Sequence, residues 1–381
     1  MLELLKSRIK FNRNELSGAF GDIGTDLPLI IGMLLATDLE ISNTLIVFGV
    51  LQMLTAVIYG IPMPVQPLKA VALIVITQNI SADVIWGGGL AIGLFMLILS
   101  LTGLLTWLSR VIPKAVIRGI QLGLGLQLCL LAIKDYIPSD GYIGFIFAAV
   151  AFTIGMILLG NKKYPPAIFI ILLGLIYTAA FNFEILAGIG FSLPTFTMPD
   201  IKSQSIITGF IVLALPQIPL SLGNSIFATN QIAKDYFPEK KITVKKIGIT
   251  YSVMNLLAPL LGGIPVCHGS GGIAGHYTFG GRTGGSAFIY GLIFIGLGLF
   301  FSGNTPESLM LFPKPILGVI LLFEGFALIV LIKDIASEKS LLLISIVVAI
   351  CAVGLPGGYI IGMITGILIY YFREKIFLSK Y

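Results

Sequence analysis

The residues of this chain that could bind an ion are concentrated in one glycine-rich stretch, residues 262–286. The stretch reads GGIPVCHGSGGIAGHYTFGGRTGGS, contains ten glycines and holds both histidines of the chain, His268 and His276. Long apolar segments flank it on both sides. Irregular backbone at membrane depth persists only where it is buried in protein or lines a polar cavity. The stretch therefore predicts a ligand-binding site inside a membrane.

A second stretch with similar features occurs about two hundred residues earlier. PMPVQPLK, residues 62–69, also opens an apolar segment. Landmarks that recur in the same order along a chain indicate an internal duplication. The matching pairs are Pro64-Val65 with Pro265-Val266 (201 apart), Pro113-Lys114 with Pro313-Lys314 (200 apart), Lys134-Asp135 with Lys333-Asp334 (199 apart) and, more loosely, DLPL at Asp26 with QIPL at Gln217 (191 apart).

The third and tenth apolar segments, near 67–80 and 268–281, are too short to cross as full helices, because a span needs about 20 apolar residues. We expect each to cross as an extended strand followed by a half-helix. In inverted repeats the two half-helix N-termini would face each other, with unpaired backbone N–H groups and positive dipole ends. This arrangement predicts an anion site at mid-membrane. The alternative is that the glycines only let helices pack closely.

Polar side chains near these segments are the candidate substrate contacts. Lys69 lies in the first turn of the first half-helix, where a lysine is costly unless it faces water or an anion; the alternative is snorkelling to an interface. His268 and His276 do not have metal-ligand spacing, and a buried, hydrogen-bonded histidine is the commoner outcome. Polar residues of the eighth span also hold helices together in membranes. The residues we expect to contact the substrate are Thr25, Gln66, Lys69, Gln217, Ser221, His268, Gly269, Ser270 and Gly271.

Three acidic residues fall in predicted spans, where uncompensated charge is expensive. Asp22 and Asp26 lie four apart in FGDIGTDLPL, residues 20–29, so they share one helix face. Two carboxylates would repel an oxyanion, so we expect them to pair with Lys69, to cap backbone N–H groups or to carry a proton. Glu324, in the twelfth span, is expected to relay protons or to pair with a cation. These three carboxylates are the candidates for proton coupling.

The composition is that of an integral membrane protein. Of 381 residues, 56% are hydrophobic and only 11% are charged, whereas soluble domains have about 25% charged residues. The net charge of +6 resides in loops, which favours a role in membrane orientation over nucleic-acid binding. The three cysteines have neither metal-ligand spacing nor a disulfide framework. We expect neither a metal nor another cofactor.

The apolar segments predict an all-α protein with about 14 transmembrane segments, arranged as two inverted seven-segment repeats. The expected regions are a cytoplasmic N-terminal segment at 1–14, a first repeat at 15–190, a second repeat at 200–373 and a cytoplasmic tail at 374–381. Basic residues gather in alternate loops, which places both termini in the cytoplasm by the positive-inside rule. Lys163 belongs to a predicted inner loop, and Lys202 to a predicted outer one.

Three motifs resemble the signatures of a known family: FGDIGTDLPL at 20–29, PMPVQPLK at 62–69 and PVCHGSGGIAGHYTFGGRTGG at 265–285. They are similar to those of the MOT-type molybdate transporters, a branch related to the SulP sulfate permeases. The resemblance covers essentially the whole chain. It implies two inverted seven-span repeats, a core domain that moves against a gate domain, and transport of molybdate or the similar sulfate. Sulfate permeases often have an Arg-Thr pair where this chain has Gly272-Ile273, so we assign the cationic role to Lys69.

The leading hypothesis is a secondary active transporter of molybdate in the cell membrane, which works by alternating access and is coupled to protons. The alternatives are a transporter of sulfate or another anion, and a passive anion channel. An enzyme is not expected, because the sequence has no nucleophile–base pattern, and no GxxxxGK[ST] motif for ATP is present. The expected partners are the oxyanion and the lipid bilayer, and a homodimer is compatible with this hypothesis.

Overall fold

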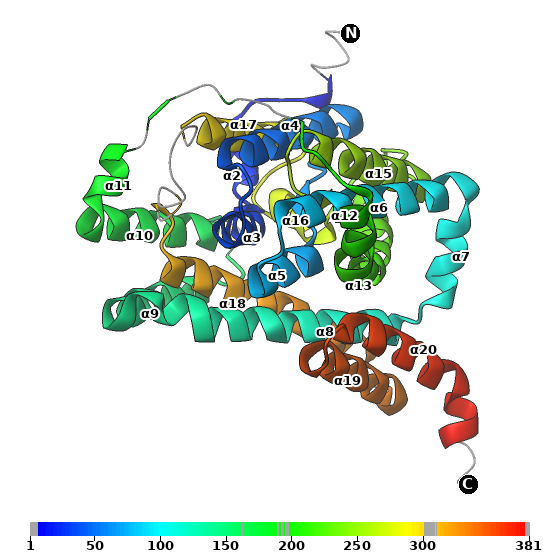
Figure 1. The fold of residues 1–381 in the computed structure, drawn as a ribbon. Coiled ribbons are helices and arrows are strands. Elements are labelled where there is room, and N and C mark those ends of the chain that lie inside the picture. The colour runs from blue at the N-terminus through cyan, green and yellow to red at the C-terminus, as the bar shows by residue number, and fades with distance from the viewer. Residues whose placement is uncertain are drawn as a thin grey trace.

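The computed structural model describes residues 7–161, 163–188, 190–191, 194, 198–300, 309 and 311–377. The described part is mostly helical (Figure 1). Residues 1–6 of the expected N-terminal segment and residues 378–381 of the expected tail lie outside the described residues.

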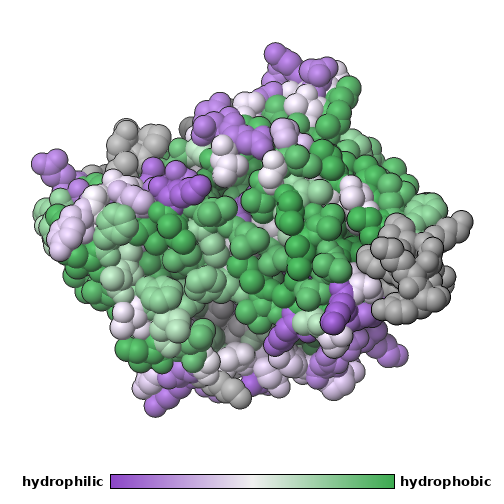
Figure 2. Space-filling view, turned by 90° about the horizontal axis from the view of Figure 1, so that it is seen from below, coloured by the Kyte–Doolittle hydropathy of each residue, from purple (hydrophilic) through white to green (hydrophobic). Residues whose placement is uncertain are grey.

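Several helices have the length and apolar character that a membrane requires. Figure 2 shows a broad apolar surface with hydrophilic residues gathered toward the edges of the view. Five helical runs among the described residues are long and apolar enough to span: Ile41–Tyr59, Ala82–Thr102, Lys114–Ile157, Ser203–Tyr236 and Lys314–Ile335. A sixth results if α2 (Arg13–Ala19) and α3 (Ile23–Ala36), which meet at 42°, form one broken span. Shorter apolar helices occupy Lys69–Gln78, Pro166–Phe181, Gly285–Phe300, Lys339–Gly354 and Gly358–Phe372.

The 44-residue run Lys114–Ile157 reverses direction near Gly141. It consists of α8 (Lys114–Leu131), the π-helical η1 (Ala132–Tyr136), the 3-10 helix η2 (Ile137–Asp140) and α9 (Gly141–Ile157). Gly141 has a φ of 59°, which glycine adopts without a Cβ clash. Both arms of this run lie beside α18 (Lys314–Val330). Successive residues of the first arm meet α18 from its C-terminal end toward its N-terminal end, whereas those of α9 meet it in the reverse order, so α8 and α9 are antiparallel. The neighbouring pairs are Tyr136 with Gly318 and Gly125 with Gly325 for the first arm, and Gly144 with Pro315 and Gly155 with Phe323 for α9.

The helices pack into two groups that each draw on both halves of the chain. In the central group, α4 (Ile41–Tyr59) packs on α17 (Gly285–Phe300), and α6 (Ala82–Thr102) packs on α15 (Val244–Leu260). This group also contains α2, α3, α5 (Lys69–Gln78), α12 (Ser203–Gly209), η3 (Phe210–Ala214), α13 (Leu215–Leu220), η4 (Ser221–Ala228), α14 (Thr229–Tyr236) and α16 (Ser270–Thr278).

The outer group is built around α8 and α18, which pack on each other. It occupies the lower part and the left edge of Figure 1. Its other helices are α9, α10 (Pro166–Phe181), α11 (Phe183–Gly188), α19 (Lys339–Gly354) and α20 (Gly358–Phe377), and α7 (Leu104–Val111) joins the two groups.

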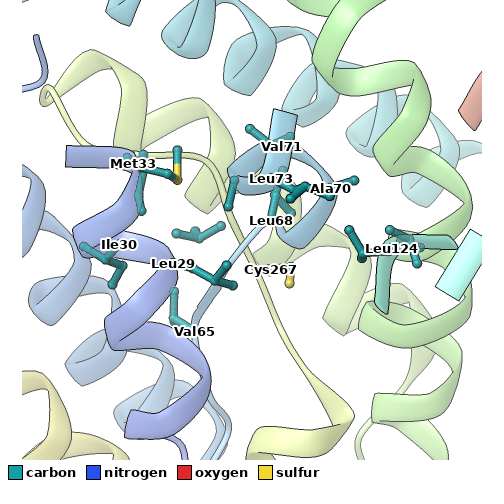
Figure 3. Close-up of a cluster of buried hydrophobic side chains, with 14 of the residues drawn as sticks. Leu29, Ile30, Met33, Val65, Leu68, Ala70, Val71, Leu73, Leu124 and Cys267 are labelled. Atoms are coloured by element: carbon teal, nitrogen blue, oxygen red, sulfur yellow. The ribbon is translucent and has the colours of Figure 1, made fainter. Parts of the chain in front are cut away.

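A two-stranded sheet lies inside the central group. β1 (Gln66–Pro67) pairs antiparallel with β2 (Val266–Cys267), with Gln66 opposite Cys267. The 10-residue α5 follows β1, and the 9-residue α16 follows β2. Apolar side chains from α3 and α5 surround the strands, and Leu124 of α8 approaches from the other side (Figure 3). The sheet thus brings together the two stretches that the sequence singles out.

The last part of the glycine-rich stretch is a loop anchored by a distant carboxylate. Glu15 is 2% exposed. Its oxygens accept hydrogen bonds from the backbone N–H groups of Arg282 (3.1 Å), Thr283 (2.9 Å) and Ser286 (2.9 Å). These bonds fix the chain where it enters α17, so this part of the stretch is structural.

Candidate functional site

Two carboxamides hold the strands that lead into α5 and α16. On α4, Gln52 donates to the carbonyl of Val65 (2.7 Å) and accepts from its N–H (3.0 Å). On α15, Asn255 donates to the carbonyl of Val266 (2.6 Å) and accepts from its N–H (2.9 Å). All four residues are buried, so these bonds satisfy backbone groups that water does not reach.

The first turns of α5 and α16 lie at the two ends of this sheet. Because β1 and β2 are antiparallel, the helices leave it in opposite directions. Neither N-cap residue, Leu68 or Gly269, supplies a side-chain cap. On α5, the N–H of Ala70 donates to Oε1 of Gln217 (3.0 Å). Each of these first turns therefore presents backbone donors and a positive dipole end at its own end of the sheet.

Lys69, the first residue of α5, forms an ion pair across the boundary between the two groups. Its Nζ contacts Oε1 of Glu324 on α18, and the two side chains are 13% and 10% exposed. The hydroxyl of Thr25, on α3, donates to Oε2 of the same carboxylate (3.1 Å). Of the alternatives for Asp22 and Asp26, pairing with Lys69 is not the one found, because Lys69 pairs with Glu324 of the outer group, as the expectation that Glu324 pairs with a cation has it.

The two aspartates of α3 have other partners. Both oxygens of Asp22 accept from Nε2 of Gln66, at 2.6 and 2.8 Å. Oδ2 of Asp26 accepts from the hydroxyl of Tyr290 (3.1 Å), and Asp26 is fully buried. Gln66 is thus fixed to α3 within the central group, and its contact with the substrate stays a prediction.

His268 is a structural residue in this conformation. Its Nδ1 bonds the carbonyl of Pro64 (3.0 Å) and its Nε2 bonds the hydroxyl of Thr250 (2.8 Å). The ring is fully buried and both nitrogens are engaged, which matches the buried, hydrogen-bonded alternative, and contact of His268 with the substrate stays a prediction. His276 is also fully buried, with its ring edge-on to Tyr290.

The glycines of α16 divide into packing positions and one open position. A Cβ at Gly269 would meet Gln66, one at Gly272 would meet Asp22, and one at Gly275 would meet the backbone of Gly21. A Cβ at Gly271 would meet nothing within 4 Å. Close packing thus explains three of these glycines, while Gly271 exposes its backbone.

Polar residues of the eighth span support the two first turns. Nε2 of Gln217 donates to Ser221 (3.2 Å), which is bonded to Tyr251 (2.8 Å). Ser270 donates to Oδ1 of Asn224 (2.7 Å). Asn224 lies in the π-helical η4, a backbone form often found at functional sites. Asn224 is one of the polar residues of the eighth span, and its spacing from Gln217 and Ser221 places it on the same helix face.

Three separate cavities lie near this centre. The space lined by Lys69, Gln217, Asn224 and Cys267 measures about 10 Å³, room for about one water. A cavity of about 200 Å³ reaches Thr25 and Glu324 from the side of Leu159, Pro165 and Phe279. Another, of about 340 Å³, lies toward the opposite end of α3, between Ala36, Asn79, Asp135 and Lys314.

The chemistry of this centre suits an anion. It combines a lysine, hydroxyl donors and uncapped helix N-termini at the boundary between two helix groups. Among the described residues, no group of three or more His, Cys, Asp or Glu side chains could hold a metal ion.

Comparisons with solved structures agree with this arrangement. The transmembrane domain of a cyanobacterial bicarbonate transporter superposes with a TM-score of 0.67, at 17% identity over 94% of this chain and 98% of that one. The murine solute carrier 26 family member A9 anion transporter, in its inward-facing state, gives a TM-score of 0.72, at 13% identity over 98% of this chain and 72% of that one. The chain shares the fold of these two membrane proteins.

Sequence comparisons identify the family. The model described as "Molybdate transporter of MFS superfamily" matches residues 14–128 and 209–328. Molybdate transporter 1 of Arabidopsis thaliana is 30% identical over 97% of this chain and 90% of its own length, and Molybdate transporter 2 of that plant is 32% identical over 89% and 82%. The chain belongs to the molybdate transporter family, as the motif resemblance predicts, and it is a transport protein rather than an enzyme.

Proposed function

We propose that this protein is a secondary active transporter of molybdate. The observation that carries the proposal is the position of Lys69, which lies at the uncapped start of α5 and faces the boundary between the two helix groups. Family membership supports molybdate as the substrate. Sulfate is the second candidate, because it is also a tetrahedral dianion and differs from molybdate chiefly in size.

In this proposal the anion binds between the first turns of α5 and α16, which are the half-helices of two inverted repeats. Lys69 supplies the charge, while Thr25, Ser270 and the backbone of Gly271 supply hydrogen bonds. Gln217 and Ser221 hold the first turn of α5 in place. Lys69 is the cation of this set, and its hydrogen bond to an oxyanion joins two charged groups.

Transport in this proposal proceeds by alternating access. The central group acts as the core and the outer group acts as the gate. Cavities at the two ends of α3 support a path along the boundary between the two groups. The basic loops favour a cytoplasmic position for both termini in the cell membrane, so the cavity near Leu159 and Pro165 opens toward the cytoplasm.

A dianion that enters a cell with a negative interior works against the membrane potential. Each elementary charge costs about 2.3 kcal/mol per 100 mV, so uptake needs a coupled cation or consumption of the substrate inside. We propose proton symport, with Asp22, Asp26 and Glu324 as the candidate carboxyl groups. Asp26 is fully buried, whereas Glu324 borders the cavity of about 200 Å³ near Leu159 and Pro165, which favours Glu324 for proton exchange.

The test is uptake of molybdate into proteoliposomes, detected by metal analysis, with tungstate and sulfate as competitors and with internal pH recorded. The proposal predicts saturable uptake that is inhibited most strongly by tungstate and is accelerated by an inward proton gradient. Unsaturable flux would indicate a channel. Equal rates with and without the gradient, and no acidification, would exclude proton coupling.

A further inference from the structure

We propose that Glu324 is an internal competitor of the substrate: its carboxylate occupies Lys69 in the empty protein, and either the incoming oxyanion or a proton must displace it. The inference rests on the proposed function in one respect, namely that Lys69 is the cation that binds the substrate. It assigns to Glu324 a positioning role that links anion binding to separation of the two helix groups.

The contacts of Glu324 carry this inference. One oxygen is paired with Lys69 of α5, and the other accepts from Thr25 of α3. Both partners belong to the central group, whereas Glu324 lies on α18 of the outer group. A single carboxylate therefore bridges the groups with both oxygens, as a bound oxyanion would do with two of its own.

The space around the ion pair explains why substrate and carboxylate exclude each other. The cavity that Lys69 lines together with Gln217 and Asn224 measures about 10 Å³, too small for a tetrahedral oxyanion, and the ammonium group of Lys69 is itself occupied by Glu324. Moving this carboxylate away from Lys69 frees the ammonium group for the anion and also breaks the two polar contacts, to Thr25 and Lys69, that join α18 to α3 and α5. Binding of the anion and loss of these two contacts are thus one event.

A proton would have the same effect as the substrate. Glu324 borders the cavity of about 200 Å³ that also contacts Leu159 and Pro165, so a hydronium ion from that side can transfer its proton to the carboxylate and leave water behind. The neutral acid no longer attracts the lysine ammonium. Lys69 is then free to bind a dianion.

The titratable groups near Glu324 differ from it in their partners. Among the described residues, the facing titratable groups are Asp22 and Asp26 on α3, Lys69 on α5 and Cys129 on α8, whose thiol lies 3.9 Å from the carbonyl of Leu322. The faces of α9 and α10 that border the same cavity contribute Gly155, Leu159, Pro166, Ala167 and Ile170. Because Asp22 and Asp26 bond Gln66 and Tyr290, Glu324 alone spans the boundary among these acids.

The test is equilibrium dialysis of the purified full-length protein against molybdate over a range from acidic to alkaline pH. The wild type should lose affinity as pH rises, by up to roughly tenfold per pH unit once Glu324 is ionised, since binding is then linked to uptake of one proton. Glu324→Gln should bind more tightly at alkaline pH, with little dependence on pH. A Glu324→Gln variant that keeps the wild-type slope would overturn the inference.

Asp334→Asn is the matched control, because it removes another acid that follows α18 and pairs with Arg118 and Lys114 within the outer group. It should keep the wild-type slope; a flattened slope in this variant would count against a specific role for Glu324. If Glu324→Gln does not melt cooperatively, Glu324→Asp replaces it, since the shorter side chain keeps the charge but retracts from Lys69. This variant should bind several-fold more tightly than the wild type, and unchanged affinity would contradict the proposal.

The two proposals fail in different ways. If the wild type does not bind molybdate at any pH, the proposed function is wrong. If the wild type binds and Lys69→Ala does not, while Glu324→Gln behaves as the wild type, only the competitor role of Glu324 is wrong.

Discussion

Gln52 and Asn255 hold Val65 and Val266 by the same two kinds of hydrogen bond, each carboxamide donating to the valine carbonyl and accepting from its N–H. The two valines lie 201 positions apart, at the offset that the sequence predicts for its repeats. Each bond pair fixes the strand that leads into α5 or α16. The relationship explains how two short helices deep in the protein keep a fixed position.

Loss of either carboxamide should destabilise the protein and reduce transport together. Gln52→Leu or Asn255→Leu leaves one buried N–H and one buried carbonyl without a partner, at about 1–3 kcal/mol per group. We expect a lower melting temperature and slower molybdate uptake for both variants. Thr208→Val is a control, because this exposed hydroxyl has only a long side-chain contact at 3.5 Å. A wild-type melting temperature in both leucine variants would show that the hydrogen bonds of Gln52 and Asn255 do not hold the strands.

Removal of the Lys69 charge should weaken substrate binding. Lys69→Ala deletes a hydrogen bond to a charged group, worth about 1.5–3 kcal/mol, so molybdate affinity should fall roughly ten- to a hundredfold. Lys134→Ala removes an exposed lysine of η1 and should bind as the wild type does. Affinities are measured by equilibrium dialysis on samples that melt cooperatively. Unchanged affinity in Lys69→Ala would remove this residue from the site.

Alanine substitutions in α16 should separate packing from binding. At Gly271 the new methyl group meets nothing within 4 Å, and alanine gains about 1 kcal/mol of helix propensity, so the fold should tolerate it while molybdate affinity falls. At Gly275 the methyl group would strike the Gly21 backbone, at a cost of about 1–3 kcal/mol. Melting curves and dialysis on both variants distinguish the effects. Full affinity in Gly271→Ala would place the anion away from this turn.

The membrane orientation can be tested with single cysteines. Lys163 and Lys202 are both exposed, and the positive-inside rule places them on opposite sides of the membrane. We expect Lys163→Cys to react with an impermeant maleimide only after the membrane is permeabilised, and Lys202→Cys to react in intact cells. Labelling in the reverse pattern would invert the topology. The parent protein without these substitutions reports the reactivity of the three native cysteines.

The sequence was sufficient to predict the membrane class and the family, and to identify the two stretches that the sheet brings together. These features depend on composition, on segment length and on motifs that are continuous in the chain. Lys69 stood out because a lysine inside an apolar segment is costly wherever it lies.

The partners of these residues could not be predicted, because they depend on packing between distant segments. Glu324 lies 255 positions from Lys69, and no periodicity indicates which neighbour its span faces. His268 was expected to contact the substrate, but its bonds to Pro64 and Thr250 depend on how α15 packs beside the strands. Likewise, Gly271 differs from the packing glycines of α16 only in the space that a Cβ added at each position would meet.

The central claim is that the oxyanion binds between the first turns of α5 and α16, and a structure determined with bound molybdate or tungstate tests it most directly. The heavy metal is located by its anomalous scattering, independently of the placement of side chains. The account predicts one peak within hydrogen-bonding reach, through the anion oxygens, of Lys69 Nζ and the backbone N–H groups of Ser270 and Gly271, with Glu324 displaced from Lys69. A peak elsewhere, with the ion pair of Lys69 and Glu324 intact, would contradict it.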